Sequence, residues 1–369
     1  MSASLNAFPG FVCRLDGIRR VDEALESAAR AHLDDLTKPR GSLGRLEDIA
    51  ARLFMISGGH APLCVEPSLV IVASGDHGVA EEGISAFPQE VTGQMLRNIL
   101  EGGAGISVLS RLNGMEMLAV DAGGIHDALS EAQYPKLRNL RLGRGTANLA
   151  RTCAMSPEQC VRALVYGMDT VRYAAEQGVR LVATGEMGIG NTTPATALFC
   201  ALYGLEPEHV VGPGTGLNSS GVRHKARVIR QALELHRNVV ADRDVLGVAA
   251  ALGGYEIMVL AGVVLGAAES RIPVLVDGFI STSAYAVAHA LCPAVADYAF
   301  LAHASAEPGY AAIMKHMGRT PLLGLGFRLG EGTGCAAAFP LLRAAAAIYN
   351  EMATFSGADV TGTERQPVE

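Results

Sequence analysis

The chain has 369 residues, 49% of them hydrophobic, which is enough for one large buried core, or for one large and one small core. The formal net charge is −7 with 18% charged residues, and the basic residues are scattered. This balance excludes a surface suited to a polyanion, so we expect no nucleic-acid partner. The seven cysteines include no CxxC pair, which argues against a disulfide framework and a structural zinc site.

The sequence gives no indication of a secretory signal or of a membrane-spanning segment. Residues 1–10 contain no basic segment followed by an apolar run, so we expect no secretory signal. The longest apolar run, 257–268, lies between Glu256 and Glu269 and is too short to span a bilayer. The sequence therefore predicts a cytoplasmic protein with small-molecule substrates and no membrane association.

The two ends of the chain differ in pattern from its middle. The first sixty residues have an amphipathic segment at 16–35 but no strand-like run, and the part after Phe339 has none either. We predict that residues 1–60 and 340–369 pack together as a smaller helical subdomain. Residues 61–339 are then expected to form a large α/β domain.

Six short apolar runs in the middle of the chain each end in a cluster of Gly, Asp, Glu or His. The clusters begin at Ser74, Asp121, Gly185, Asp277, His303 and Gly326. Continuous apolar runs are typical of strands buried on both faces, as in a parallel sheet covered by helices. We predict a doubly wound, mainly parallel six-stranded α/β fold, in which all six clusters fall at the carboxyl ends of the strands, where ligands bind.

Helical segments fill the gaps between these runs. The clearest begins at Ser156, which is a helix N-cap followed by Pro157 and a capping-box Gln159, and it ends near Gly178. Further Ala-rich helices are predicted at 194–202, 222–240, 246–268 and 281–291.

The segment from Gly185 to Thr192 nearly fits the phosphate loop of nucleoside-triphosphate enzymes, but Asn191 occupies the lysine position. This argues against a triphosphate substrate. What is left is a strand, a glycine turn and a helix N-terminus that would hold a phosphate monoester. The predicted phosphate contacts are Gly188, Ile189, Gly190, Asn191 and Thr192. The alternative is a glycine turn that only packs a helix against the sheet.

A second glycine-rich loop surrounds Glu331, with glycine at positions 330, 332 and 334. A desolvated glutamate has a raised pKa and accepts a proton from a weak acid, so Glu331 is a candidate base, as is Glu186 in the first loop. The alternative is a carboxylate bonded to its own loop. Gly-Pro-Gly-Thr-Gly at 212–216, followed by Lys225, is either a second anion contact or an ordinary loop before a helix.

Two other clusters suggest metal ligation or a catalytic dyad, Asp-His-Gly at 76–78 and His-Ala-Ser-Ala-Glu at 303–307. Neither has a third ligand nearby, so we interpret both as turn-shaping groups and predict no metal site. The sequence also lacks the GxSxG and HExxH patterns of serine hydrolases and zinc proteases.

Several long motifs occur together in one order. They are Thr-Lys-Pro-Arg-Gly-Ser-Leu-Gly at 37–44, Asp-His-Gly-Val-Ala at 76–80, Glu-Met-Gly-Ile-Gly-Asn-Thr-Thr-Pro-Ala at 186–195, Gly-Pro-Gly-Thr-Gly at 212–216, Val-Asp-Gly-Phe-Ile at 276–280 and Arg-Leu-Gly-Glu-Gly-Thr-Gly at 328–334. In these motifs the chain resembles the nicotinate-nucleotide:dimethylbenzimidazole phosphoribosyltransferase family, which supplies the lower ligand of cobalamin.

The resemblance implies a reaction and roles for these residues. Family members transfer the 5-phosphoribosyl group of nicotinate mononucleotide to 5,6-dimethylbenzimidazole, with inversion at C1′ and release of nicotinate. By motif match Glu331 is the catalytic base, and Glu186 lies beside the ribose or assists in catalysis. The phosphate contacts extend to Gly214, Thr215 and Lys225. No metal and no cofactor is implied, and the family implies a homodimer.

The acceptor pocket is expected in segment 85–95, which matches the family's base-binding stretch and supplies Ser85, Phe87 and Gln94. The alternative is an ordinary loop and helix start. The chain departs from the family pattern at Tyr310, where histidine is common, and at Gly324, where aspartate is common.

Two other functions remain open from the sequence. A transferase of the same fold acting on a purine or a phenol would share every phosphate-side feature and differ only near Phe87. A non-catalytic nucleotide sensor would keep the glycine loops but would have no need of Glu331.

Overall fold

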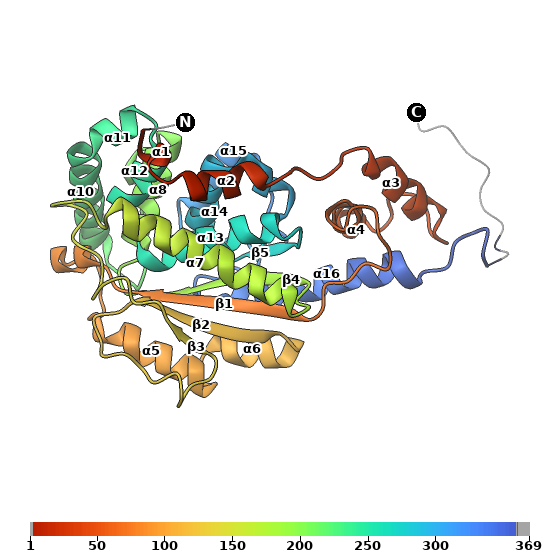
Figure 1. The fold of residues 1–369 in the computed structure, drawn as a ribbon, viewed down its shortest axis with the longest axis horizontal. Helices are drawn as coiled ribbons and strands as arrows, with labels where there is room; N and C mark the ends of the chain where they lie inside the picture. Colours follow the sequence, from red (N-terminus) through yellow and green to blue (C-terminus); the bar gives the residue numbers. More distant parts are fainter. Residues whose placement is uncertain (1–2, 359, 361–369) are drawn as a thin grey trace.

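A six-stranded parallel sheet forms the centre of the molecule in the computed structural model, which describes residues 3–358 and 360 (Figure 1). The strands are β1 (Ser68–Gly75), β2 (Glu116–Gly123), β3 (Leu137–Asn139), β4 (Leu181–Met187), β5 (Val274–Val276) and β6 (Ala299–Leu301). Their order across the sheet is β3-β2-β1-β4-β5-β6, and every neighbouring pair is parallel.

The direction of the chain across the sheet reverses between β1 and β4, the central pair. Val72 of β1 lies opposite Ala119 of β2 on one side and Gly185 of β4 on the other. The three strands β1, β4 and β5 are buried almost throughout, as their apolar runs predict. The doubly wound α/β prediction is confirmed, and the reversal point is where such sheets bind ligands.

One predicted strand is wrong. The run Pro-Leu-Leu-Gly-Leu at 321–325 forms no strand and makes only a single bridge, between Leu323 and His303. Its proline has no N–H to donate to a ladder, and its residues are half-buried or exposed. The strand that completes the six is β3, which was not predicted. It consists of three residues at the edge of the sheet, and its sequence Leu-Arg-Asn contains no apolar run.

Helices and short turns of 3-10 helix connect the strands. The α-helices are α1 (Ala3–Asn6), α2 (Pro9–Gly17), α3 (Leu25–Asp35), α4 (Arg45–Ile56), α5 (Glu90–Glu101), α6 (Gly105–Asn113), α7 (Pro157–Glu176), α8 (Thr192–Tyr203), α9 (Pro207–Val210), α10 (Ser219–Leu235), α11 (Arg237–Ala241), α12 (Val245–Leu252), α13 (Tyr255–Glu269), α14 (Phe279–Leu291), α15 (Tyr310–Met317) and α16 (Thr333–Glu351). The 3-10 helices are η1 (Gly78–Glu82) and η2 (Pro293–Asp297).

The predicted helices are present, but three of them are divided. The capping box at the start of α7 is complete, because the Ser156 hydroxyl accepts from the Gln159 N–H and the Gln159 side chain accepts from the Ser156 N–H. The segment 246–268 is two helices, α12 and α13, because Gly253 and Gly254 adopt extended conformations between them. The segments 16–35 and 222–240 are likewise interrupted.

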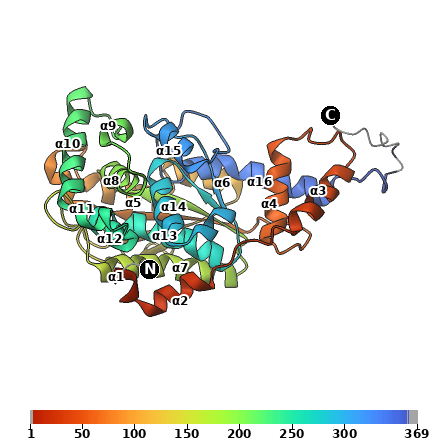
Figure 2. The same ribbon diagram turned by 90° about the horizontal axis from the view of Figure 1, so that it is seen from above.

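Helices cover both faces of the sheet (Figures 1 and 2). The buried helix α13 packs across β1, β2 and β4, with α7 along its outer side and α14 beside it. The other face carries α5, α6 and α16. Gly262 and Gly167 allow α13 and α7 to approach closely, since a Cβ on either would lie 2.0–2.1 Å from a backbone oxygen of the other helix.

A group of helices extends away from the sheet at one end of the molecule (Figures 1 and 2). It consists of α3, α4 and the second half of α16, which pack on one another. The Phe54 and Tyr349 rings stack there with centroids 5.4 Å apart. The helices α1 and α2 instead contact α12 and α13. The division into 1–60 plus 340–369 and 61–339 stays a prediction, and residues 359 and 361–369 lie outside the described part of the chain.

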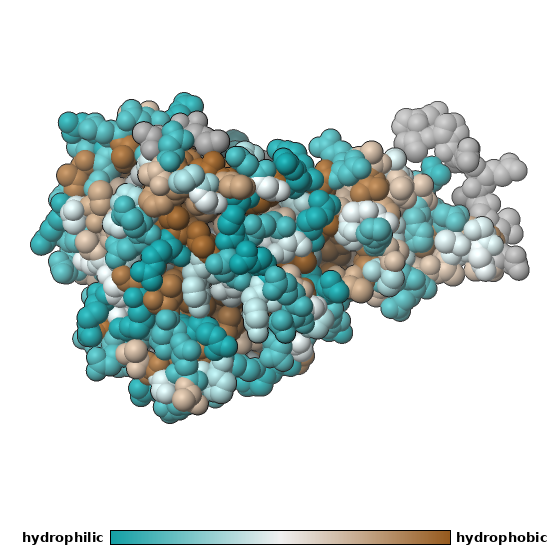
Figure 3. All heavy atoms as spheres, viewed as in Figure 1, coloured by the Kyte–Doolittle hydropathy of each residue, from teal (hydrophilic) through white to brown (hydrophobic). Residues whose placement is uncertain are grey.

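The surface on the face seen in Figure 3 is mostly hydrophilic, with apolar patches between the polar side chains. Within the described residues, no helix is both long enough and apolar enough to cross a bilayer.

Candidate active site

A cavity of about 480 Å³ opens at the carboxyl edge of the sheet, around the ends of β4, β5 and β6. Eleven of the thirteen residues predicted for the site line this cavity: Ser85, Phe87, Glu186, Gly188, Ile189, Gly190, Asn191, Thr192, Gly214, Thr215 and Glu331. The other two, Gln94 and Lys225, do not line it. The cavity therefore gathers residues from widely separated parts of the chain, from Ser85 to Glu331.

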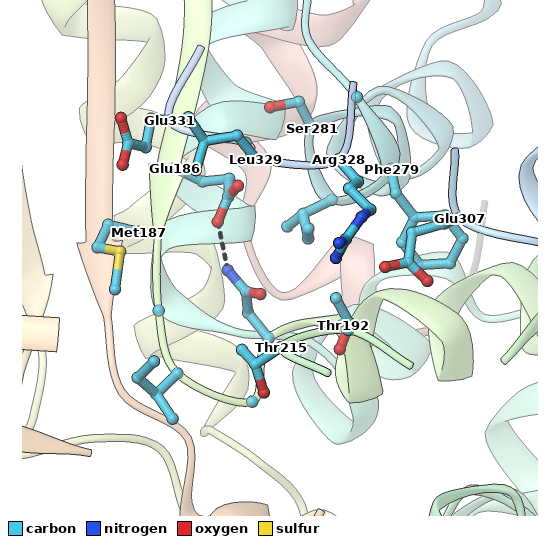
Figure 4. Close-up of a pocket in the computed structure, with 18 of the residues that line it drawn as sticks. Glu186, Met187, Thr192, Thr215, Phe279, Ser281, Glu307, Arg328, Leu329 and Glu331 are labelled. Atoms are coloured by element: carbon cyan, nitrogen blue, oxygen red, sulfur yellow. Dashed lines mark hydrogen bonds between the residues drawn. The ribbon is translucent and has the colours of Figure 1, made fainter. Parts of the chain in front are cut away.

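The two glutamates lie at one end of the cavity (Figure 4). Glu186 is the penultimate residue of β4, and Glu331 lies in the loop before α16. Both side chains are nearly buried, at 6% and 5% exposure. The strand and the loop are pressed together, because a Cβ on Gly330 would lie 2.1 Å from Oε1 of Glu186.

Glu331 is held in an unusual backbone conformation. Its φ is +64°, in the left-handed region that non-glycine residues seldom occupy, so the loop stores strain at this position. Its Oε2 accepts the N–H of Ile106 at 3.2 Å, at the first turn of α6. Burial raises the pKa of Glu331, and the nearby Asp277 adds to this, although the hydrogen bonds from α6 oppose it. The result is a carboxylate that is a better proton acceptor than a solvated one.

Glu186 accepts a hydrogen bond from the Asn191 side-chain amide at 2.5 Å (Figure 4). Burial raises the pKa of Glu186 to about 8, and the charges of Asp277 and Glu256 contribute in the same direction. Asn191, in the position of the phosphate-loop lysine, thus binds a glutamate within its own turn.

The glycine turn after β4 leads directly into α8, whose N-terminus faces the cavity. The Ile189 N–H donates to the Thr92 hydroxyl at 3.0 Å, and the Asn191 N–H donates to the Gly188 carbonyl at 3.2 Å. The N–H groups of Gly190 and Thr192 are among those of the turn that make no hydrogen bond within the described part of the chain. These two remain to bind an anion, with the favourable dipole of α8 behind them.

The opposite end of the cavity carries a cluster of charges that the sequence did not reveal (Figure 4). Arg328 and Glu307 both line it. Lys225 lies behind this surface at 1% exposure, and its Nζ donates to the Thr192 hydroxyl at 2.5 Å. Burial lowers the pKa of Lys225 to about 8 and raises that of Glu307. An anion at this end would meet the guanidinium directly and the ammonium through Thr192.

Asp277 anchors the Glu331 loop. Its carboxylate accepts the N–H groups of Gly332 at 3.1 Å and Cys335 at 3.2 Å. His303 lies 3.6 Å away, and both of its ring nitrogens lack a hydrogen-bond partner within the described residues. His303 and Glu307, the two ends of the segment 303–307 that we interpreted as turn-shaping, both line the cavity. The sequence signal for a place at the cavity was that the segment 303–307 directly follows a predicted strand.

The predicted acceptor segment lies at the cavity wall, with one exception. The Ser85 hydroxyl is 3.3 Å from the Thr215 hydroxyl, and Phe87 is 52% exposed at the rim. Gln94 is exposed and does not line the cavity, because helix α5 turns it outward. The same helix points other, apolar side chains inward, and β4 and the segment after η1 add more: Ile84, Val91, Met95 and Met187.

His77 forms a buried pair with Glu256 beneath the glycine turn, with Nε2 2.7 Å from Oε1. Burial opposes the charged imidazole, but the carboxylates of Glu256 and Asp76 outweigh it and raise the pKa of His77. A Cβ on Gly188 would lie 3.2 Å from an atom of each of these two side chains, so the glycine turn packs directly against the pair. Among the described residues, no group of three or more His, Cys, Asp or Glu side chains is arranged to hold a metal.

The two departures from the family pattern lie in different surroundings. Tyr310 is buried, and its hydroxyl is 3.2 Å from the Thr282 hydroxyl. Thr282 lies on α14 directly after residues 279–281, which line the cavity. Gly324 is exposed, and a Cβ there would meet nothing within 4 Å. The space at 324 would therefore accept a larger residue.

Fold and site together define a class: a doubly wound α/β protein with unpaired N–H groups at a helix N-terminus that faces a cavity, and with two desolvated carboxylates in the wall of the same cavity. Comparison with known proteins narrows this class. A family model described as phosphoribosyltransferase matches residues 18–360. A protein of Solidesulfovibrio magneticus, named nicotinate-nucleotide–dimethylbenzimidazole phosphoribosyltransferase, is 56% identical over 347 residues, which cover 94% of this chain and 97% of its own.

Other relatives agree. A protein of Nitratidesulfovibrio vulgaris with the same name is 53% identical over 94% of this chain and 97% of its own. The crystal structure of CobT from Thermus thermophilus superposes with a TM-score of 0.86 at 42% identity, covering 92% of this chain and 99% of that one. The chain belongs to the nicotinate-nucleotide–dimethylbenzimidazole phosphoribosyltransferase family.

Proposed function

We propose that the protein transfers the 5-phosphoribosyl group of nicotinate mononucleotide to 5,6-dimethylbenzimidazole, giving α-ribazole 5′-phosphate and nicotinate. The reaction belongs to the assembly of the nucleotide loop of cobalamin. The names of relatives that are 53–56% identical over almost the whole chain support this proposal. The chemistry of the cavity supports it independently.

The bond changes require one base. An acceptor nitrogen attacks C1′ of the ribose, the C1′–N bond to nicotinate breaks, and its electron pair stays on the pyridine nitrogen. The leaving group departs neutral at its ring nitrogen and needs no acid. The acceptor must lose its N–H proton, which passes to the Glu331 carboxylate. Glu186 lies beside the ribose in this proposal, which is supported by its position next to Glu331 in the cavity wall (Figure 4).

One part of the cavity suits the phosphate of the nucleotide, and another suits the planar acceptor base. The phosphate binds the N–H groups of Gly190 and Thr192 and the Arg328 guanidinium, with Lys225 behind Thr192. The planar base lies against the apolar side chains of Met95 and Met187. No metal is needed, because the transferred group is a monophosphate and no pyrophosphate leaves.

The observation that carries the proposal is the placement of Glu331. A non-glycine residue in a strained conformation, with a raised carboxyl pKa, lines the wall of the cavity that also carries an anion site. A sensor that only binds a nucleotide has no use for this strained base. Strain of this kind persists where the surrounding structure and the function require it.

The test is a mass-spectrometric assay of nicotinate release from nicotinate mononucleotide, with dimethylbenzimidazole, an unsubstituted benzimidazole, adenine and a phenol as separate acceptors. We expect nicotinate release with dimethylbenzimidazole and with benzimidazole to require the acceptor and to yield the corresponding α-riboside phosphate. Release that is fastest with adenine or the phenol would assign the transferase another acceptor. No release with any acceptor would leave nucleotide binding alone.

We propose further that the protein is a homodimer and is cytoplasmic. Apolar side chains are exposed on α6 and beside the cavity, with Val108 at 48%, Leu112 at 77% and Leu329 at 62% exposure, and a second copy of the chain would cover them. All seven cysteines are free, as is usual in a reducing compartment. Light scattering on the purified protein and cell fractionation test these two proposals.

A further inference from the structure

A second pocket lies between α4 and the chain around β6, and it shares no lining residue with the active-site cavity. Its volume is about 250 Å³. Three arginines line it: Arg45 and Arg52 from α4, and Arg319 from the turn after α15. The reaction proposed above uses none of these residues.

The three guanidinium groups are held in place by backbone carbonyl oxygens. Arg52 donates from Nε to the Asp297 carbonyl at 2.8 Å and from Nη2 to that of Ala296, and it lies 4.6 Å from the centroid of the Phe300 ring. Arg319 donates from Nη2 to the same Ala296 carbonyl at 2.8 Å. The carbonyls that accept from Arg45 belong to residues 320, 321 and 322. The orientations of all three side chains are therefore set.

The pocket has a surplus of positive charge. Within the described part of the chain, none of the three arginines forms an ion pair with a carboxylate. Asp48 also lines the pocket, but it pairs with Arg30 at 2.8 Å, and the Asp297 carboxylate pairs with Arg20 at 3.2 Å. Burial and the neighbouring Arg319 lower the pKa of Arg52 to about 10. Of the three, Arg52 is the desolvated one, and a desolvated charge in a protein is normally paired, so its guanidinium lacks an anion; Arg319 is half-buried and Arg45 lies at the exposed edge of the pocket.

Each guanidinium also has donors to spare. A guanidinium carries five N–H groups, and Arg52 uses two of them on carbonyl oxygens. Arg319 uses its Nη2 group alone, on the carbonyls of Ala296 and Ala299. The fork of N–H groups on an arginine matches the oxygens of a phosphate in a bidentate manner.

We propose that this pocket is a binding site for a phosphate-class oxyanion, held by Arg45, Arg52 and Arg319. The anion joins α4, which belongs to the extended helical group, to the sheet strand β6 and to the turn after α15 that packs against it. Its binding therefore stabilises the docking of these two parts. Inorganic phosphate and the phosphate of a mononucleotide offer the same oxygens to the arginines.

The experiment measures inorganic phosphate binding by calorimetry and by the rise in Tm, in buffer free of other oxyanions. The variants are Arg319→Gln, Arg45→Gln and the matched control Arg237→Gln, which removes an exposed arginine of α11. Lys225→Ala is included because the active site also binds phosphate. Nicotinate mononucleotide is titrated in parallel, to distinguish free phosphate from a nucleotide phosphate.

We expect phosphate to bind the wild type, Lys225→Ala and Arg237→Gln alike at this site, and to raise the Tm of each. Arg319→Gln and Arg45→Gln should weaken that binding at least about tenfold, because each removes a charge-assisted contact. Arg45 is exposed, so its variant decides the question if Arg319→Gln does not fold. Loss of all phosphate binding in Lys225→Ala, or unchanged binding in Arg45→Gln, would overturn the proposal.

Discussion

The Glu331 carboxylate accepts the backbone N–H of Ile106 at 3.2 Å, so the proposed base sits at the N-terminus of α6. The helix dipole and this hydrogen bond favour the ionised form. Burial favours the neutral form more strongly, and the pKa of Glu331 is raised. The side chain is therefore held in place as an anion by a structure that also strengthens it as a base.

Replacing Glu331 with glutamine should abolish transfer without disturbing the fold. The amide oxygen of Gln can still accept from Ile106, but it cannot take the acceptor's proton. We expect kcat to fall about 10²- to 10⁴-fold, the usual contribution of a general base. The Michaelis constant for the nucleotide should change little. The exposed Glu234→Gln is the control, and near wild-type turnover of Glu331→Gln would rule out the role.

Lys225 should affect the nucleotide and not the base. Its Nζ donates to the Thr192 hydroxyl at 2.5 Å, behind the proposed phosphate site. A charge-assisted contact is worth about 1.5 to 3 kcal/mol, so Lys225→Ala should raise the Michaelis constant for the nucleotide about ten- to a hundredfold. Lys225→Met keeps the buried volume and should behave alike. A change in the constant for the base instead would move Lys225 to the acceptor side.

The pH dependence of kcat/KM for the nucleotide should be bell-shaped. Activity should fall as pH drops through the raised pKa of Glu331, since the base is then protonated. It should also fall as pH rises through about 8, where the Lys225 ammonium loses its proton. Glu186 titrates in the same range, with a pKa of about 8. Loss of the alkaline limb in Lys225→Met assigns it to Lys225, and its persistence assigns it to Glu186.

Glu186 should make the protein less stable as pH rises. Its folded pKa of about 8 lies above the ordinary value of 4.5, so the folded state holds the proton more tightly. The stability that this provides is complete below pH 4.5 and is lost as pH rises to about 8. Thermal unfolding of Glu186→Gln should therefore match the wild type at low pH and show a higher Tm at pH 9. If Glu186→Gln and the wild type had the same Tm at low pH and also at pH 9, this prediction would be contradicted.

The transfer reaction should not depend on a divalent metal. Asn191 replaces the lysine of a triphosphate loop and binds Glu186, so the turn suits a monophosphate held by N–H groups. We expect the rate to be unchanged in excess EDTA, measured with dialysed protein. A loss of activity that magnesium restores would instead point to the carboxylates at the strand ends, Asp76, Asp121 and Asp277.

Local sequence patterns were enough to predict five of the six strands and the main helices. Continuous apolar runs specify strands buried on both faces, and Ser156 with Gln159 specifies the start of α7, because these signals act over a few residues. The two glutamate loops and the anion turn after β4 were predictable for the same reason. The resemblance to a family then assigned them roles.

The tertiary structure decided what lies together. The edge strand β3 has no apolar run, because one of its sides has no neighbouring strand and its polar residues remain accessible. Arg328 and Glu307 meet at one end of the cavity only because β6 and the loop before α16 end at the same edge of the sheet. Lys225 reaches the anion turn from behind, across 33 positions of sequence. Such contacts depend on packing between distant elements, and no local pattern in the chain records them.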